Sequence, residues 1–199
     1  MAEQRTENPR VGGSIPPLAT LLTRCLRETY ALGIDDICAY QLRLSDADRG
    51  LFAVSVFAGL RPSEAEAVQW EHVKLDRGFL EVVRAKTRDR RNVALSANLV
   101  AWLKPLERDS GPVFGGHSRR WRDRVMKAIA AEEEADPLAQ WPQDLLRHTY
   151  GSYHLEKHHN ATEMAHEMGH QGNPRMLYNH YRELVTPEDA TAFWEILPG

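Results

Sequence analysis

The sequence predicts a mainly α-helical (α+β) domain that carries one small three-stranded antiparallel sheet. Apolar residues recur at helical spacing over most of the 199 residues, as in helices that bury one face. After Trp70 the apolar period changes to 2, and from Ser96 onward it is helical again. Between these two points, turn residues separate three short strands. Helices therefore flank the sheet on both sides in the sequence.

The N-terminal part is expected to begin with a flexible lead-in over residues 1–16, which are polar and rich in Gly and Pro. Residues 17–30 have the apolar spacing of a helix, and residues 34–44 suit a second short helix or an irregular connection. Ser45 with Asp48 resembles a capping box, so we expect a helix to open there and to run through Phe57.

A break follows at residues 59–62, which read Gly-Leu-Arg-Pro. Neither Gly nor Pro continues a helix well, so the chain is expected to turn here. Ser63 with Glu66 predicts the cap of another helix that runs to about Gln69.

Three strands are expected over residues 72–75, 79–85 and 92–95. An Asp-Arg-Gly turn at 76–78 joins the first two, and the basic loop 86–91 joins the last two. The helices expected after the sheet span about residues 96–108, 118–134, 142–157, 161–168, 174–182 and 187–196. The last of these has Thr186 as its N-cap and a proline at its first position.

Composition is that of an ordinary globular protein. No apolar run approaches the roughly 18 residues of a membrane span, and the N-terminus lacks a signal-peptide pattern. Cys25 and Cys38 are too few for a disulfide framework and favour reduced thiols, so we expect a cytoplasmic protein. The net charge of −3 argues against indiscriminate binding of nucleic acid.

Basic residues are nevertheless gathered in two groups, each of which is either a solvated face or a local DNA-binding surface. The groups are Arg84, Lys86, Arg88, Arg90 and Arg91, and Arg119, Arg120, Arg122, Arg124 and Lys127. From them we predict as DNA contacts Arg84, Arg88, Arg90, Arg119, Arg120 and Arg122.

Five residues at element junctions suit phosphoryl transfer from a nucleic-acid backbone. They are Arg61, Lys86, Arg147, His170 and Tyr181. Two arginines can clamp the non-bridging oxygens of a phosphate and stabilise the charge that develops on them. A tyrosine can attack phosphorus, and a lysine or histidine can protonate the leaving oxygen. This chemistry requires neither a metal nor a cofactor.

At these residues the sequence resembles the tyrosine recombinase (phage integrase) family. FAGLRPSEAEAVQW resembles the family's first arginine motif, LLRHTYGSYHL its second arginine box, and EMGH followed by a tyrosine its histidine and nucleophile box. The resemblance covers about residues 45–196 and implies the family's helical catalytic domain.

The resemblance implies strand cleavage and rejoining through a 3′-phosphotyrosine, normally within a tetramer on double-stranded DNA. It assigns phosphate binding to Arg61 and Arg147, the general acid to Lys86, the late histidine to His170, and the nucleophile to Tyr181. Lys104 and Lys127 are alternatives for the general acid, and Glu64 fits the family's buried acidic residue.

Two positions depart from the family pattern. Asp144 stands three residues before Arg147, where the family usually has a histidine. Neither Tyr178 nor Tyr181 lies at the usual distance from His170; Tyr178 lies nearer and Tyr181 farther. We favour Tyr181, because the sequence His-Tyr-Arg-Glu-Leu before the last helix resembles the family's ending.

The resemblance implies that residues 17–199 form the catalytic domain and that the N-terminal core-binding domain is absent. It also implies a bacterial protein that works at the nucleoid. One alternative is a catalytically degenerate DNA-binding or interaction module of the same fold. A remote alternative is a zinc protease, because residues 166–170 read HEMGH and match the HExxH pattern.

Overall fold

The computed structural model describes the chain in several stretches. They are residues 31–35, 37–38, 44–83, 90–114, 121, 123, 144–170, 174–182 and 185–198. The expected lead-in and the helix expected over 17–30 lie outside them. Of the helix expected over 118–134, residues 121 and 123 are described, and both are helical.

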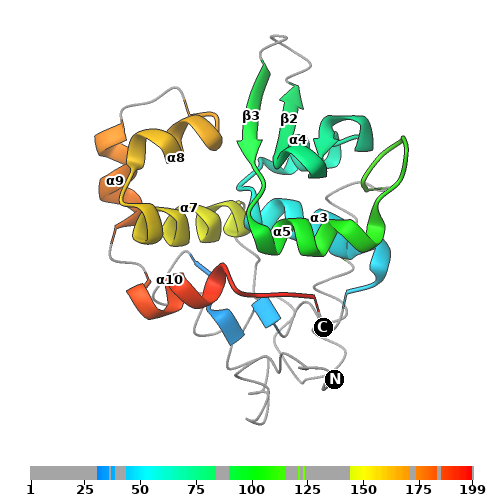
Figure 1. Cartoon of the computed structure of the whole chain (residues 1–199). Coiled ribbons are helices and arrows are strands. Elements are labelled where there is room, and N and C mark those ends of the chain that lie inside the picture. Colours follow the sequence, from blue (N-terminus) through cyan, green and yellow to red (C-terminus); the bar gives the residue numbers. More distant parts are fainter. Residues whose placement is uncertain are drawn as a thin grey trace, which may run out of the picture.

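Helices dominate the described fold, and the small sheet stands at one edge of them (Figure 1). Its strands follow in the order β1-β2-β3, and both neighbouring pairs are antiparallel. The predicted fold class is therefore confirmed. No helix in the described stretches is long and apolar enough to cross a bilayer.

The central helix is α3 (Asp46–Phe57), whose second half is almost entirely buried. Helices α5 (Ala97–Leu103) and α7 (Leu145–His158) both pack against it. The capping box expected at Ser45 is not formed. The Ser45 hydroxyl donates to the Asp48 carboxylate at 2.8 Å and makes no bond to a backbone N–H.

Helix α4 (Pro62–Glu66) begins earlier than predicted and is shorter. Its N-cap is Arg61 rather than Ser63, because the Glu64 carboxylate accepts the backbone N–H of Arg61 at 3.1 Å. Pro62 fits the first helical position, where its missing N–H has no helical partner. The helix ends at Glu66 and does not continue to residue 69 as predicted. The chain then reaches the sheet through the short 3-10 helix η1 (Trp70–His72).

The sheet consists of β1 (Val73–Lys74), β2 (Phe79–Val83) and β3 (Arg90–Ala94). β1 is shorter than predicted because η1 and a second 3-10 helix, η2 (Leu75–Arg77), occupy its ends. β3 starts two residues before the predicted Asn92, because Arg90 and Arg91 pair with Val83 and Val82 of β2.

The C-terminal half adds α8 (Ala161–Glu167), α9 (Pro174–Tyr181) and α10 (Pro187–Phe193). The predicted cap of α10 is confirmed, since the Thr186 hydroxyl accepts the Asp189 N–H at 3.1 Å. The Phe193 ring stacks on the Tyr153 ring, with centroids 4.3 Å apart, and packs 5.1 Å from the Phe57 ring. α10 therefore completes the core beneath α7 (Figure 1).

Several helices end or begin inside their predicted bounds. α5 gives way at Lys104 to the 3-10 helix η3 (Lys104–Leu106), which contains a proline. α7 starts at Leu145 because Asp144 has a φ of 64°, a left-handed conformation that does not continue a right-handed helix. α10 ends at Phe193, three residues before Ile196.

Candidate active site

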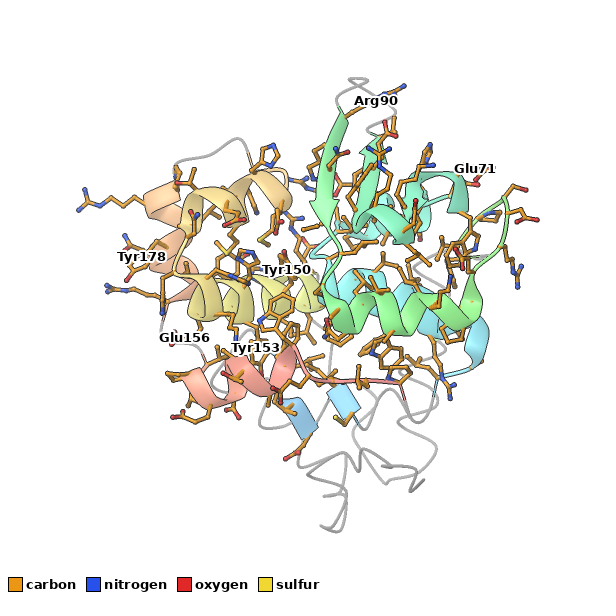
Figure 2. The ribbon with its side chains drawn as sticks, viewed as in Figure 1. Glu71, Arg90, Tyr150, Tyr153, Glu156 and Tyr178 are labelled. Carbon is orange, nitrogen blue, oxygen red and sulfur yellow. The ribbon has the colours of Figure 1, made fainter. Side chains whose placement is uncertain are left out.

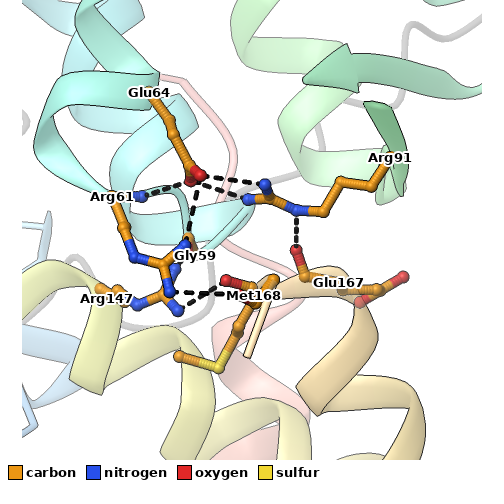
Figure 3. A network of polar contacts seen from close by, with 8 residues as sticks. Gly59, Arg61, Glu64, Arg91, Arg147, Glu167 and Met168 are labelled. Carbon is orange, nitrogen blue, oxygen red and sulfur yellow. Dashed lines mark hydrogen bonds and ion pairs between the residues drawn. The ribbon is translucent and has the colours of Figure 1, made fainter. Parts of the chain in front are cut away.

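Arg147 projects from the first turn of α7 and is almost fully buried, with 4% of the residue exposed. Its Nη1 donates to the carbonyl of Gly59 at 2.6 Å, and its Nη2 donates to the carbonyl of Met168 at 2.6 Å (Figure 3). Two main-chain carbonyls from distant segments of the chain therefore fix this guanidinium.

Gly59 has to be glycine for this arrangement. Its φ is +59°, which side-chain-bearing residues rarely adopt, and a Cβ built here would lie 2.3 Å from the Tyr150 ring. The predicted break at residues 59–62 thus brings a carbonyl to Arg147 and starts α4 beside it.

Arg61 lies at the start of α4 and remains partly accessible, with 35% of its side chain exposed. Its Nη1 donates to Glu64 Oε1 at 3.2 Å, and its Nη2 donates to the carbonyl of Gly169 at 3.1 Å. The two arginines predicted to bind phosphate are thus brought to neighbouring carbonyls, Met168 and Gly169.

A third arginine, Arg91 on β3, joins this site and was not predicted from the sequence as a site residue. Its Nη1 and Nη2 donate to Glu64 Oε1 and Oε2 at 3.0 and 2.7 Å, and its Nε donates to the carbonyl of Glu167 at 2.8 Å. The side chains of Arg91 and Glu64 are both less than 10% exposed. The available signal was strand alternation, which puts Arg91 on the same face as the buried Val93.

We call Arg61, Glu64, Arg91 and Arg147 the arginine cluster. Its three guanidinium groups bind three consecutive carbonyls, those of Glu167, Met168 and Gly169, at the C-terminal end of α8 (Figure 3). A helix C-terminus carries partial negative charge and lacks helical partners for its last carbonyls, so it suits cations. The end of α8 therefore organises the cluster.

Charge within the arginine cluster is unbalanced, because the cluster has three guanidinium groups and one carboxylate, that of Glu64, which accepts hydrogen bonds from Arg61 and Arg91. Burial opposes ionisation of Glu64, but hydrogen bonds from Arg91 and Arg61 and their charges outweigh it and lower its pKa to about 2. Burial, followed by the charge of Arg61, lowers the pKa of Arg147 to about 10. Both groups are ionised at neutral pH, and the excess positive charge suits an anion.

Tyr181, the predicted nucleophile, lies at the end of α9 and is 3% exposed. Its ring centroid is 5.4 Å from that of His148, and a Cβ on Gly151 would come within 3.0 Å of the ring. Burial raises the pKa of Tyr181, the charge of Arg147 lowers it, and the charge of Asp144 raises it. The phenol therefore lies within the electric field of both Arg147 and Asp144.

The other predicted residues of this region are less centrally placed. Tyr178 is 44% exposed and points outward from α9 (Figure 2). His170 directly follows the carbonyl that holds Arg61, and its backbone N–H donates to the Ala165 carbonyl at 2.8 Å. Asp144 is half-buried just before α7.

Five of the six predicted DNA contacts lie outside the described residues, and so does Lys86, the predicted general acid. The five are Arg84, Arg88, Arg119, Arg120 and Arg122. Arg90 is described at the end of the sheet, where 70% of its side chain is exposed and its Nη1 lies 2.9 Å from Glu81 Oε1 (Figure 2). It is the part of the predicted DNA surface that can be placed.

A second buried network lies on the other side of Glu167. The Tyr150 hydroxyl donates to Glu167 Oε2 at 2.5 Å, and His154 Nε2 lies 3.2 Å from the same oxygen. We call these three residues the Tyr150 network. Although burial alone raises the pKa of Glu167, hydrogen bonds from His154 and Tyr150 bring it below its usual value.

This network argues against the zinc protease interpretation of residues 166–170. Glu167 would be the catalytic base of an HExxH site, but its carboxylate is bound by Tyr150 and His154. His166 is exposed, and α8 ends at Glu167 before it can carry His170. Among the residues that the structure describes, no three His, Cys, Asp or Glu side chains are grouped to hold a metal ion.

The chain is similar to known proteins in sequence and in fold. The sequence matches the phage integrase family over residues 30–186. No curated protein sequence matches the chain. The fold is similar to the catalytic domain of bacteriophage HP1 integrase, with a TM-score of 0.57 and 20% identity over 77% of this chain and 87% of that one.

Two recombinases of known structure are also similar in fold. XerA recombinase has a TM-score of 0.56 and 18% identity over 85% of this chain. XerH site-specific recombinase, crystallised with its difH substrate in a pre-cleavage complex, has a TM-score of 0.55 and 18% identity over 86% of this chain. The present chain spans 65% of the XerA chain and 56% of the XerH chain.

Proposed function

The chain belongs to the phage integrase family and has the fold of its catalytic domain, and from this premise we propose how its residues cleave and rejoin DNA. It is a tyrosine-type site-specific recombinase domain. The observation that carries the residue assignment is the convergence of Arg61, the N-cap of α4, with Arg147 of α7 and Tyr181 of α9.

In this proposal Arg61 and Arg147 bind the non-bridging oxygens of the scissile phosphate. Each already has two N–H groups occupied by fixed acceptors, so neither has to be ordered when DNA arrives. A guanidinium has five N–H donors, and the remaining ones are available to a phosphate. Preorganised charge of this kind stabilises the transition state without reorganisation.

Tyr181 is the proposed nucleophile. It lies in the field of Arg147, whereas Tyr178 is exposed and points outward from α9 (Figure 2). Its hydroxyl oxygen attacks phosphorus, the bond from phosphorus to the 5′-oxygen breaks, and a 3′-phosphotyrosine forms. Lys86, in the sequence between β2 and β3, gives its proton to the 5′-oxygen.

Asp144 fits this reaction as an acceptor. An ionised carboxylate cannot donate a hydrogen bond to phosphate, as the family's usual histidine can. It can take the proton that Tyr181 loses, and its charge already acts on that hydroxyl. His170, beside the carbonyl that holds Arg61, supports the phosphate-binding end of the site.

Double-stranded DNA is the proposed partner, and the similar XerH recombinase was crystallised with its difH substrate. The exposed Arg90 and the other predicted basic residues would contact its backbone. We further propose that the domain, residues 17–199, works as part of a tetramer on DNA at the bacterial nucleoid.

A covalent-trapping experiment tests this function. The substrate is a pool of nicked or bridging-phosphorothiolate duplexes drawn from the sequences that flank the gene, and adducts are resolved on a denaturing gel. We expect the natural chain and Tyr178→Phe to form a covalent DNA adduct and Tyr181→Phe to form none. An adduct with Tyr181→Phe, together with its loss in Tyr178→Phe, would move the nucleophile to Tyr178.

A further inference from the structure

Arg91 has no role in the reaction proposed above, although its guanidinium is buried in the arginine cluster and bound on three of its N–H groups. We propose that Arg91 is a positioning residue, which holds Glu64 so that Arg61 stays oriented and able to bind phosphate. This inference rests on the proposed function.

The first support is the way in which Glu64 is shared. Oε1 accepts Nη1 of Arg61 and Nη1 of Arg91, while Oε2 accepts the backbone N–H of Arg61 and Nη2 of Arg91. The fork from Arg91 is bidentate and has the shorter contacts, so it sets the plane of the carboxylate. Glu64 in turn holds both the backbone and the side chain of Arg61.

The second support is electrostatic. A carboxylate that is neutralised by Arg91 competes weakly with DNA phosphate for Arg61. Without Arg91, the Glu64 carboxylate would bind Arg61 more strongly, and the pair would cancel charge that phosphate binding needs. Arg91 therefore leaves the positive charge of Arg61 available to a phosphate.

The third support is the position of Arg91 on the sheet. It pairs with Val82 across β2 and β3, and the residues between these strands include Lys86. Its Nε also binds Glu167, next to the carbonyls that hold Arg147 and Arg61. Arg91 thus joins β3 to the end of α8, whose next carbonyls hold Arg147 and Arg61.

The kinetic test compares Arg91→Met, Arg91→Lys and the double variant Arg91→Met/Glu64→Gln. Arg77→Met is the matched control, because Arg77 is an exposed arginine next to the same sheet and stands over the Phe79 ring rather than at Glu64. Single-turnover cleavage and DNA affinity are measured for each variant, and circular dichroism verifies folding.

We expect Arg91→Met to slow cleavage about 100-fold, as a misplaced phosphate-binding group does, and Arg91→Lys to fall between it and the natural chain. The double variant removes the competing carboxylate and the buried unpaired charge together, so it should fold and recover cleavage by about tenfold over Arg91→Met. A purely structural role predicts no recovery. Cleavage by Arg91→Met equal to that of Arg77→Met, or a double variant no faster than Arg91→Met, overturns the proposal.

A second measurement needs no DNA and separates this inference from the proposed function. Guanidinium NMR of the free protein reports whether the Arg61 side chain is held. We expect the Arg61 signals to shift and broaden in Arg91→Met and to stay unchanged in Arg77→Met. Unchanged Arg61 signals in Arg91→Met contradict the positioning role, whereas a natural chain that forms no covalent adduct contradicts the proposed function and leaves the NMR result to decide the role of Arg91.

Discussion

The arginine cluster and the Tyr150 network are both largely buried and both involve Glu167, yet they differ in their balance of charge. The backbone carbonyl of Glu167 binds Arg91 of the cluster, while its carboxylate binds Tyr150 and His154. The cluster has three guanidinium groups and one carboxylate, which binds two of them. In the Tyr150 network, the carboxylate has a donor from each of its two neighbours.

This difference indicates that the Tyr150 network serves stability, whereas the arginine cluster serves function. Buried polar groups that satisfy one another hold elements together, and here they fasten α7 to α8. Buried charge of one sign costs stability unless a partner arrives, so its presence in the arginine cluster indicates a ligand of the opposite sign. In the proposed function, a backbone phosphate of DNA supplies that charge.

The largest expected effect concerns the cluster. Arg147→Gln removes a preorganised cation beside the proposed nucleophile, and we expect single-turnover cleavage to fall by about 10²–10³-fold. Quantification of the trapped adduct over time measures it, with Arg77→Gln as the exposed control. A loss smaller than about tenfold would remove Arg147 from the phosphate site.

A change in the Tyr150 network should act on stability instead. Glu167→Ala leaves the Tyr150 hydroxyl and the His154 imidazole buried without their acceptor, so we expect the free energy of unfolding to fall by about 3 kcal/mol. Urea denaturation followed by circular dichroism measures it. An unfolding free energy equal to that of the natural chain would show that the network does not fasten α7 to α8.

The carboxylate of the cluster predicts a pH dependence. Because the folded pKa of Glu64 is lowered to about 2, its ionised form stabilises the fold above its ordinary pKa, and this contribution is lost as the pH falls toward 2. We expect the natural chain to exceed Glu64→Gln in unfolding free energy by on the order of 3 kcal/mol at pH 7, a difference that shrinks below about pH 4.5. Denaturation of both proteins between pH 2 and pH 7 measures it, and a pH-independent difference contradicts it.

The smallest effect concerns a single hydrogen bond of the Tyr150 network. Tyr150→Phe removes the donor at 2.5 Å from Glu167 Oε2 but leaves His154 in place, so we expect a loss of about 1.5 kcal/mol in unfolding free energy. The same urea titration measures it. A loss as large as that of Glu167→Ala would mean that Tyr150 alone carries the network.

The sequence was sufficient for the parts of the site that lie in contiguous motifs. Arg61 follows a glycine break, and Arg147 opens a helix, so local patterns alone predict that both arginines lie at element junctions. The change of period after Trp70 likewise predicted the sheet, because alternation is a local property of a strand.

Other features depend on partners far away in the chain. In the sequence, Arg91 was predicted to belong to the basic loop 86–91. In the structure it belongs to β3, which begins two residues earlier than predicted and packs against α8. Tertiary contacts thus decided the position of Arg91 against its local sequence pattern. The starts of α4 and α7 are decided locally instead, by Glu64 capping Arg61 and by the left-handed conformation of Asp144.

The most direct test of the division between cluster and network measures cleavage and stability on the same preparations of Arg147→Gln and Glu167→Ala. Single-turnover cleavage is corrected for the folded fraction, and unfolding free energies come from urea titration. We predict that Arg147→Gln loses most of its cleavage rate but keeps most of its unfolding free energy. The folded fraction of Glu167→Ala should cleave within about threefold of the natural chain, although its unfolding free energy is much lower. If the two variants lost cleavage and stability in the same proportion, the division between a phosphate-binding cluster and a structural network would be wrong.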